Sequence, residues 1–595
     1  MFLGLVSSLL FLVVPIVLVV WAVRHFGNRS TGGGGGIDAR SVRRFFQYLL
    51  LYGLMIVAAV GLSELLGLLV EKPALAGGDR SGLARALTFS VFGLPMFALM
   101  VAWSRRRLRA DRDEARSLGW AFYATLAPLT ALVSSMFALH DVASAALVDP
   151  RLDGAALTRT VVWAAAWFGN WTVAKRLLDA DRRRVQLAIG SLIGLATTVA
   201  GLAWLLGASL DALLVDPAKT LVGGQSNELG QAAATVVVGV PVWVVYWLRG
   251  LATDRRSPLW FGYVLPIGVG GSLVLAVVGA SIALNKVLVW FLGEPASTQA
   301  ATHFDGTAVA GACVVVGAAS WWYHRQVLAG ATPERTEVTR VYEYLMSGIA
   351  LLAAAVGVTM VIVALVESLL PAPAVEVGTA VVNSLLAGVT LLLVGGPLWW
   401  VFWSRIGRAT RSDHSAPHAA DADAVPSVAA AATYADELAS PTRRLYLFVL
   451  FGLGGVAAVI AVLVAAFFGF QGALKGGFDA QVVRDMRIPV AILLATGAIS
   501  GYHWAVYRDD RSRLPAASAG GGPRYVLLVG APDAAVGRAV EHRTGARVEV
   551  WVRTDGLAAP WVLDDVVAAV RGSEADAVTV VAGPAGLEAI GMQRP

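Results

Sequence analysis

The hydrophobic residues of this chain are gathered into long, nearly continuous segments, and polar residues fill the short stretches between them. Most of these segments hold 20 or more residues, the length that a helix needs to cross about 30 Å of hydrocarbon. The first occupies residues 2–23, and the others pair into six repeated hairpins. We therefore predict an all-α polytopic membrane protein with thirteen transmembrane helices. The twelve hairpin helices are expected at 45–70 and 83–103, 118–142 and 157–175, 185–214 and 229–248, 259–293 and 306–325, 341–370 and 377–403, and 445–470 and 488–507.

The second helix of most hairpins ends in clustered tryptophans that arginine or lysine follows. An indole ring is stable at the headgroup level, where the ring is half-buried and its N–H stays wet, and an arginine beyond it reaches the lipid phosphates. We therefore expect these tryptophans to anchor the helices at the interface, with a specific lipid or ligand contact as the alternative. The expected anchors are Trp103, Trp171, Trp247, Trp322, Trp403 and Trp504.

Composition and charge placement support a membrane location and give an orientation. The chain is 57% hydrophobic and 15% charged, whereas a soluble domain carries about 25% charged residues. Connections on one side of the predicted helices hold 27 Lys and Arg residues, against 7 on the other. Because positive residues stay on the cytoplasmic side, this asymmetry predicts an outside N-terminus and a cytoplasmic C-terminus. The net charge of +6 does not indicate nucleic-acid binding.

Changes in composition divide the chain into seven parts. The first apolar segment has no basic residues before it, so we expect a retained membrane helix and not a cleaved signal peptide. Two polar stretches lack the apolar content to fold alone. The expected parts are an N-terminal helix at 1–27, a glycine-rich linker at 28–42, hairpins one to five at 43–408, a disordered cytoplasmic linker at 409–441, the sixth hairpin at 442–510, a tether at 511–523, and a cytoplasmic α/β domain at 524–595.

The last part differs in kind from the rest. Strands are predicted at 525–530, 547–553 and 577–582, with a further strand at 587–591, and helices are predicted at 534–543 and 560–571. The turn from Gly530 to Gly537 lacks the spacing and the lysine of a phosphate-binding loop, so an ordinary turn is expected. We expect this small α/β domain to bind a cytoplasmic protein partner.

Seven ionisable residues fall inside or near the ends of the predicted membrane helices. Charge in hydrocarbon is costly, so such residues are candidates for a proton or cation path. The alternative is that each lies close enough to the outer interface to stay hydrated. These residues are Glu64, His140, Asp141, Asp211, Glu228, Lys286 and Glu367.

No pattern of an enzyme or a metal site is found. Cys313 is the single cysteine, so the chain can form neither an internal disulfide nor a cysteine-based metal site. His303 and Asp305 have no further ligand-type neighbours in the sequence. We therefore predict no catalytic residues, no bound metal and no cofactor.

Several hairpins share a motif with a known family. Three first helices open with basic residues before aromatics, as in Arg43-Arg44-Phe45-Phe46-Gln47-Tyr48, Arg340-Val341-Tyr342-Glu343-Tyr344 and Arg443-Arg444-Leu445-Tyr446. With the Trp-rich, basic endings, this pattern resembles the bacterial family DUF5671 over about residues 40–510. The second and fourth hairpins open differently, with Leu118-Gly119-Trp120 and Leu259-Trp260-Phe261. The resemblance implies a multi-pass protein of the bacterial cytoplasmic membrane and no catalytic residues, because the family has no established activity.

Three function classes follow from these observations. The array of similar hairpins and the tethered C-terminal domain favour a non-enzymatic membrane scaffold or signalling component, with the lipid bilayer and a cytoplasmic protein as its partners. A transporter or channel for a small solute or ion is the alternative, because proline and glycine in the second helices are able to break them at a binding site. A membrane-embedded enzyme is the weakest candidate.

Overall fold

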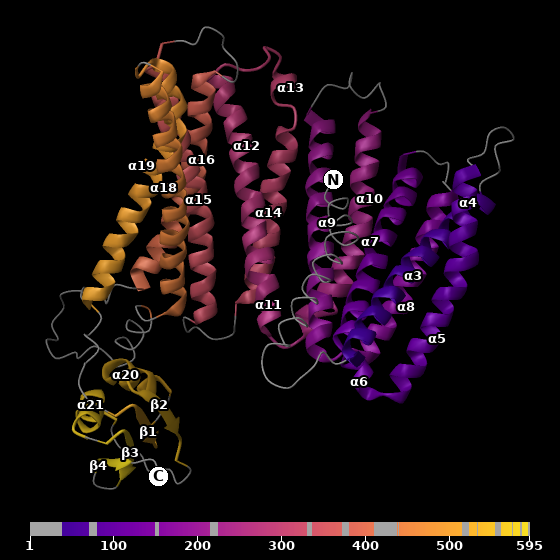
Figure 1. Ribbon diagram of the computed structural model, residues 1–595. Helices are drawn as coiled ribbons and strands as arrows, with labels where there is room; N and C mark the ends of the chain where they lie inside the picture. Colours follow the sequence, from indigo (N-terminus) through magenta and orange to yellow (C-terminus); the bar gives the residue numbers. More distant parts are fainter. Residues whose placement is uncertain are drawn as a thin grey trace. The chain divides into compact units, whose positions relative to one another are not determined.

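The computed structural model of the chain describes residues 39–592 with several gaps and consists mainly of long helices (Figure 1). The gaps are residues 71–79, 149–153, 215–223, 330–335, 372–379, 410–436, 438–439, 476, 514–522, 532–533, 554–560, 574 and 584–585. The helix predicted at 1–27 lies outside the described residues, as do most of the segments 28–42 and 409–441. The chain divides into two compact units, the first with residues 1–286 and 296–329, the second with 287–295 and 330–595.

The first unit contains the first four predicted hairpins, and every helix predicted there is found as a helix. Its elements are α3 (Ala39–Val70), α4 (Arg80–Thr88), η3 (Phe89–Gly93), α5 (Leu94–Ala110), α6 (Arg112–Ala115), α7 (Leu118–Val148), α8 (Gly154–Leu177), α9 (Ala180–Leu214), α10 (Gly224–Trp243), η5 (Val244–Leu248), η6 (Leu251–Thr253), α11 (Pro258–Tyr263), η7 (Val264–Gly271), α12 (Ser272–Leu292, whose end belongs to the second unit), α13 (Ala300–His303) and α14 (Thr307–Leu328).

Three of these elements, η3, η5 and η7, are π-helical turns. Each contains a proline or lies within three residues of one, namely Pro95, Pro241 and Pro266. Proline has no backbone N–H, so it interrupts the regular hydrogen-bond ladder and favours such local widening.

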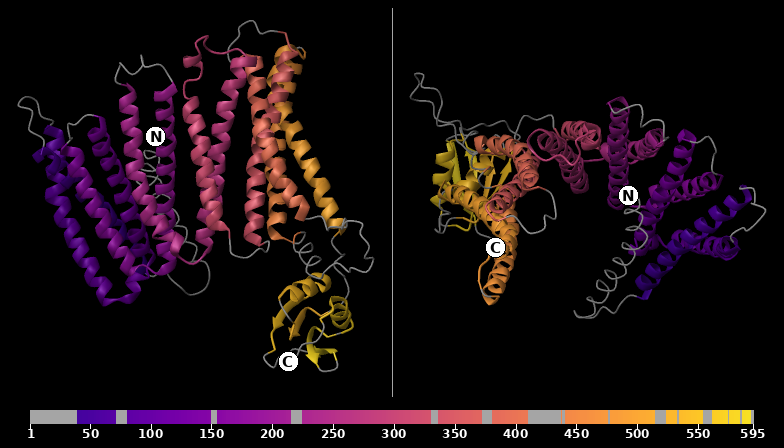
Figure 2. Two further views of the ribbon diagram at one scale, coloured as in Figure 1. Left: turned by 180° about the vertical axis from the view of Figure 1, so that it is seen from behind. Right: turned by 90° about the horizontal axis from the view of Figure 1, so that it is seen from above.

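The second unit contains the last two hairpins and the C-terminal domain. Its elements are α15 (Glu337–Ser368), α16 (Val381–Ala409), α18 (Pro441–Leu474), α19 (Ala480–Arg513), β1 (Tyr525–Val529), α20 (Ala534–Thr544), β2 (Arg547–Trp551), α21 (Leu563–Arg571), β3 (Ala577–Gly583) and β4 (Gly586–Met592). Helix α15 packs along α16, and α18 packs along α19, as Figures 1 and 2 show from different sides. Helix α19 also packs against α15.

Within the described residues, nine helices are long and apolar enough to cross a membrane. They are Arg43–Val70, Ser81–Ala110, Leu118–Val148, Ala180–Leu213, Asn227–Thr253, Pro258–Leu292, Glu337–Ser368, Val381–Ala409 and Pro441–Leu474. Helices α8, α14 and α19 are helical as predicted, but tryptophan, polar or charged residues lower their mean hydropathy. The helical membrane class is therefore supported, while the number of thirteen spans stays a prediction.

Ion pairs close three hairpins at the end where the basic residues gather. In each, an arginine at the start of the first helix binds a carboxylate that follows 67–70 residues later, at or beyond the end of the second helix. The pairs are Arg44 with Asp111 and Glu114, Arg184 with Asp254, and Arg443 with Asp510. The side chains of Arg443 and Asp510 are only 5% and 12% exposed. Removing one partner of such a buried pair leaves an uncompensated charge and costs about 3–5 kcal/mol.

The C-terminal domain is a four-stranded sheet with two helices on one face. The strand order is β2-β1-β3-β4, with β1 parallel to β2 and β3, and β4 antiparallel to β3. Alternate residues of β1, including Val526 and Leu528, point into a core with valines of α20 and α21, such as Val540 and Val566. The four strands and two helices agree with the elements predicted for this domain.

The described helices extend past two predicted boundaries. Helix α3 begins at Ala39, so the glycine-rich linker predicted at 28–42 ends earlier than expected. The residues that follow the glycines include alanine and arginine, which are good helix formers, so the helix begins there. Helix α19 continues to Arg513, three residues into the tether predicted at 511–523.

Candidate functional site

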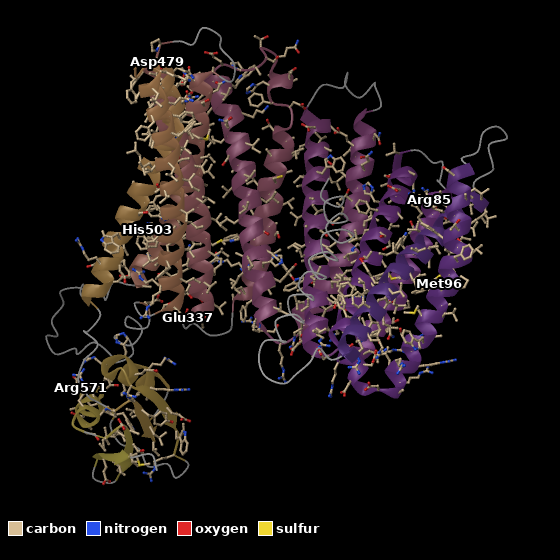
Figure 3. The ribbon with its side chains drawn as sticks, in the orientation of Figure 1. Arg85, Met96, Glu337, Asp479, His503 and Arg571 are labelled. Carbon is tan, nitrogen blue, oxygen red and sulfur yellow. The ribbon has the colours of Figure 1, made fainter. Side chains whose placement is uncertain are left out.

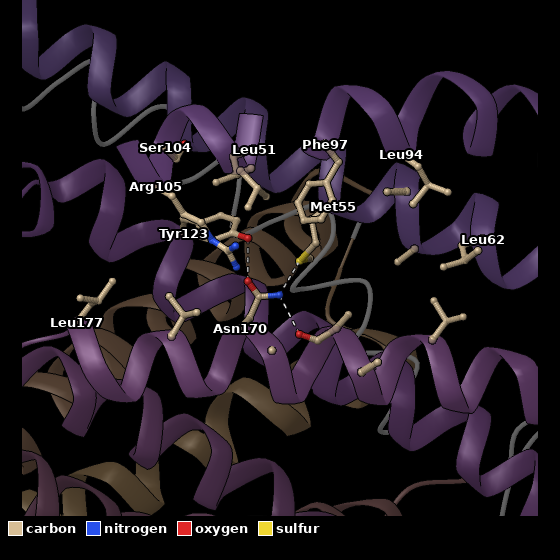
Figure 4. Close-up of a pocket in the computed structure, with 18 of the residues that line it drawn as sticks. Leu51, Met55, Leu62, Leu94, Phe97, Ser104, Arg105, Tyr123, Asn170 and Leu177 are labelled. Carbon is tan, nitrogen blue, oxygen red and sulfur yellow. Dashed lines mark hydrogen bonds between the residues drawn. The ribbon is translucent and has the colours of Figure 1, made fainter. Parts of the chain in front are cut away.

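A cavity of about 850 Å³ lies between α3, α5, α7 and α8 of the first unit (Figure 4). Most of its wall is apolar, with Leu51 and Leu62 from α3 and Leu94 and Phe97 from α5. Polar side chains gather at the basic end of these helices. They are Ser104, Arg105, Arg109, Trp120, Tyr123, Asn170 and Arg176. The cavity is therefore amphipathic along its length.

The polar end is held by hydrogen bonds between helices. The Tyr123 hydroxyl on α7 donates to Asn170 Oδ1 on α8 at 2.7 Å, and Asn170 Nδ2 donates to the backbone carbonyl of Ala166 at 2.8 Å (Figure 4). The same amide nitrogen approaches Met55 Sδ at 3.5 Å. The indole N–H of Trp120 is buried and has no hydrogen-bond partner among the described residues. Trp120 therefore contributes its ring to the wall of the cavity, and its N–H stays buried.

The charged side chains among the described residues that line the cavity are all cationic. Arg105, Arg109 and Arg176 line the polar end, and no carboxylate is found among the described residues that line the cavity. Figure 4 shows Arg105 beside Tyr123 at this end. Glu114 of α6 is bound by Arg43 and Arg44. Because unpaired guanidinium groups beside an apolar wall favour an anion, the site suits a negatively charged group attached to an apolar chain.

Comparison within the chain explains why the cavity exists. The hairpins pair into three four-helix repeats, the first repeat at 39–177, the second repeat at 180–328 and the third repeat at 337–513. In each repeat a glycine of the second helix lies directly against the first helix, which gives the register between the two helices. These glycines are Gly93 against Val57 and Ala58, Gly239 against Thr197 and Thr198, and Gly395 against Ala350, Ala353 and Ala354.

The residue eight positions after this glycine differs between the repeats. It is Val101 in the first repeat, where it lines the cavity, but Trp247 in the second and Trp403 in the third. Both tryptophans are buried, at 0% and 7% exposure. A valine therefore occupies the position where the other two repeats place a large ring.

The fourth helix shows the same change at a second position. Asn170, His324 and His503 each bond through a side-chain nitrogen to the backbone carbonyl four residues earlier, at 2.8 Å in all three. The residue before each is Gly169, Tyr323 or Tyr502.

In the second and third repeats, the tryptophan and the tyrosine meet. Trp247 Nε1 donates to the Tyr323 hydroxyl at 2.9 Å, and Trp403 Nε1 donates to the Tyr502 hydroxyl at 2.6 Å. In the first repeat, Val101 and Gly169 replace both rings, and the cavity opens in their place. Two small residues at matched positions account for the cavity better than imperfect packing does.

The expected tryptophan anchors divide into two groups. Trp322 and Trp504 are more than half exposed, and Trp103 is 37% exposed, so their role as interfacial anchors stays a prediction. Trp103 lies near the guanidinium groups of Arg43 and Arg107, and Trp171 lies 5.3 Å from Lys175 Nζ.

Trp247 and Trp403 are corrections to the expected anchors. Both are buried core residues whose indole N–H binds a tyrosine of the fourth helix. The Trp-Arg pattern in the sequence is the same in both groups. Trp247 and Trp403 differ in that each indole lies against a tyrosine of the fourth helix and donates a hydrogen bond to it.

Five of the seven ionisable residues predicted as a path have partners of their own. Glu64 pairs with Arg85 of α4, the arginine that Figure 3 labels, Asp141 pairs with Arg159, and Glu367 pairs with Arg484 and Arg487. Lys286 Nζ donates to the carbonyl of His303 at 2.7 Å, His140 lies 3.3 Å from the carbonyl of Gln231, and Asp211 lies in the last turn of α9. None of these residues lines the cavity described above. Within the described residues no group of three or more His, Cys, Asp or Glu is placed to hold a metal.

Sequence reasoning missed the residues that shape the cavity. Val101, Gly169 and Asn170 carry no motif of their own, and Tyr123 looks like one aromatic among many. The available signal was a departure from the repeat, because the first repeat has Gly169-Asn170 where the others have Tyr-His.

The internal repeats agree with a comparison against known protein families. The model described as "Domain of unknown function (DUF5671)" matches three times, over residues 44–173, 184–319 and 340–498. Each match falls in one four-helix repeat and spans two hairpins. No curated protein and no solved structure matches the chain. Since the matches cover more than half of its residues, the chain belongs to the DUF5671 family.

Proposed function

We propose that this protein is a non-enzymatic integral membrane component whose first repeat binds an amphiphile with an anionic head group. The observation that carries the proposal is the amphipathic cavity, whose apolar wall ends at three arginines. The expected ligand is a fatty acid or a single-chain phosphate ester. Its chain would lie along Leu62 and Leu94, and its head would face Arg105.

The head group would supply most of the selectivity. Lipid hydrocarbon is as apolar as the cavity wall, so moving a chain from the bilayer into the cavity gains little. A carboxylate or phosphate, in contrast, accepts charge-assisted hydrogen bonds from arginine, each stronger than a neutral one. Because basic residues mark the cytoplasmic side, we infer that the ligand enters from the inner leaflet and that the N-terminus is outside.

The C-terminal domain would connect this binding to a partner protein in the cytoplasm. The proposal is supported by the sheet face opposite α20 and α21, where Trp551, Ile590 and Met592 are 56%, 43% and 49% exposed. Aromatic and methionine side chains are typical of protein interfaces. Deleting residues 522–595 should leave membrane insertion intact and abolish recovery of the partner, and unchanged recovery would contradict this part.

Transport of a small ion is the alternative function, and it has less support. It needs a shared polar path, whereas Glu64, Asp141 and Glu367 each pair with an arginine of another helix. A flux assay in vesicles decides between the two. Substitution Glu64→Gln should leave flux at the level of empty vesicles, and a flux that depends on Glu64 would favour transport.

The direct test is ligand binding by the full-length protein purified in mild detergent. Mass spectrometry identifies amphiphiles that co-purify, and a dansyl-labelled undecanoic acid measures affinity by fluorescence. Arg105→Gln with Arg109→Gln should weaken binding by about ten- to a hundredfold, equivalent to about 1.4–2.8 kcal/mol. Arg106→Gln is the matched control, because Arg106 is exposed on the same helix and does not line the cavity. Equal affinity in the double variant and the wild type, or equal loss in the control, would overturn the proposal.

A further inference from the structure

A second, smaller cavity of about 240 Å³ lies where the first repeat meets the second. It is formed by the end of α8, the start of α9 and the segment around η5. It shares no lining residue with the larger cavity. The two cavities are therefore separate sites, and a ligand in the smaller one is independent of the proposed function.

Three cations line this small cavity. Lys175 comes from α8, Arg183 from α9 and Arg249 follows η5. No carboxylate is found among the described residues that line it. The acidic residues of the neighbouring segments have arginine partners outside the cavity, since Asp179 pairs with Arg182, and Asp181 and Asp254 pair with Arg184. Asp254 also interacts at longer range with Arg183, so the three cations leave the cavity with a net positive charge that is partly compensated.

A buried amide in the same wall lacks a partner. Gln186 lines the cavity, its side chain is 2% exposed, and its Nε2 has no hydrogen-bond partner among the described residues. Leaving a buried donor without a hydrogen-bond partner destabilises the folded protein. Such a group is retained more easily where a ligand accepts its hydrogen bond.

A buried glutamine of the first repeat does have an acceptor. Gln47 donates through Nε2 to Ser104 Oγ at 3.1 Å. Gln186 differs from it, since its Nε2 has no such acceptor among the described residues.

We propose that this cavity binds a phosphate group. A phosphate carries a charge of about −1.5 to −2 and three acceptor oxygens, which matches two guanidinium groups, one ammonium and one amide donor. The group has two sources with the same chemistry, a phospholipid head group or free phosphate. Trp171 also lines the cavity and stacks near Lys175, so an apolar portion next to the phosphate is tolerated.

The experiment uses the full-length protein in phosphatidylcholine nanodiscs, with and without added phosphatidic acid. Radiolabelled inorganic phosphate tests the free form, and native mass spectrometry tests retention of phosphatidic acid. Arg249→Gln and Gln186→Leu should each weaken binding at least about tenfold, because the first removes a charge and the second a donor. Arg255→Gln is the matched control, as Arg255 lies nearby but does not line the cavity.

Each outcome decides the proposal. Saturable phosphate binding that Arg249→Gln weakens supports a free-phosphate site, and retention of phosphatidic acid lost in the same variant supports a head-group site. Arg249→Lys keeps the charge and should retain binding, which separates loss of the site from loss of folding. Binding of neither probe, or equal loss in Arg255→Gln, overturns the proposal. The fatty-acid titration above should be unchanged in Arg249→Gln, so failure of one site is distinguishable from failure of the other.

Discussion

Filling the cavity of the first repeat with the two aromatic side chains of the other repeats tests the account of the site directly. The change is Val101→Trp with Gly169→Tyr, which copies the pairs Trp247 with Tyr323 and Trp403 with Tyr502. A Cβ placed at Gly169 meets no atom of the described residues within 4 Å, so the new ring has room. We expect the double variant to fold with the cavity closed.

The magnitude follows from separate contributions. Replacing a glycine inside a helix stabilises it by about 0.5–1 kcal/mol. The new indole–phenol hydrogen bond adds a net contribution of about 1 kcal/mol, and this part appears only when both changes are present. The double variant should therefore be more stable than the wild type by about 1.5–2 kcal/mol, with a coupling energy of about 1 kcal/mol between the two positions. Binding of the dansyl fatty acid should fall by at least about a hundredfold, or 2.8 kcal/mol.

Two assays measure these effects on the single variants and the double variant. Thermal unfolding in detergent gives the stability ranking and the coupling, and fluorescence titration gives affinity. The reverse change, Trp247→Val with Tyr323→Gly, should open a cavity in the second repeat and destabilise the protein by about 3–5 kcal/mol, because a fully buried tryptophan is truncated. A Val101→Trp, Gly169→Tyr variant that binds the fatty acid as tightly as the wild type would refute the assignment of the cavity as the binding site. A coupling energy of zero between the two substituted positions would refute the structural match between the repeats.

Three further predictions concern charges. Asp510→Asn should lower the free energy of unfolding by about 3 kcal/mol, because Arg443 then stays buried without its counter-charge. The control is Asp181→Asn, whose side chain is 88% exposed and which should change the free energy of unfolding by less than about 0.5 kcal/mol. Equal effects of the two variants in unfolding curves would contradict the role of burial. The pKa of Glu549 is held below its ordinary value of 4.5 by hydrogen bonds from Tyr525 and Trp551. This carboxylate therefore stabilises the C-terminal sheet above pH 4.5, and the contribution is lost as the pH falls through the lowered pKa. Hydrogen exchange of β1 and β2 in the full chain should show this loss, and Glu549→Gln should remove it; the same pH profile in both proteins would count against it. The Arg184 guanidinium lowers the pKa of Asp254 through their hydrogen bond. Asp254→Asn should therefore increase hydrogen exchange at the start of α9 at pH 7, and Asp113→Asn is the exposed control. Unchanged hydrogen exchange in Asp254→Asn would show that the pair does not hold this hairpin closed.

The sequence alone predicts those features of the structure whose physical cause lies within one segment of the chain. An apolar segment of about 20 residues determines a membrane helix by its own length, and the alternation in 525–529 and 577–582 determines strands by its own period. The helices of all six hairpins and the C-terminal sheet were predictable for this reason. The grouping of basic residues at one end is equally visible, because it depends only on counting along the chain.

The site depended on tertiary structure, because its residues are ordinary until helices bring them together. Val101 and Gly169 are 68 positions apart, and their small size creates a cavity only where α5 and α8 face each other. Trp103 lies ten positions after Gly93 and is partly exposed, whereas Trp247 lies eight positions after Gly239 and is buried against Tyr323 of the facing helix. Gln186 is one glutamine among several in the sequence, and only packing leaves its Nε2 buried without an acceptor among the described residues. The sequence by itself determined the helices and their basic ends through local hydrophobicity and charge, and only packing between distant segments decided which side chains fill the interior and where space remains for a ligand.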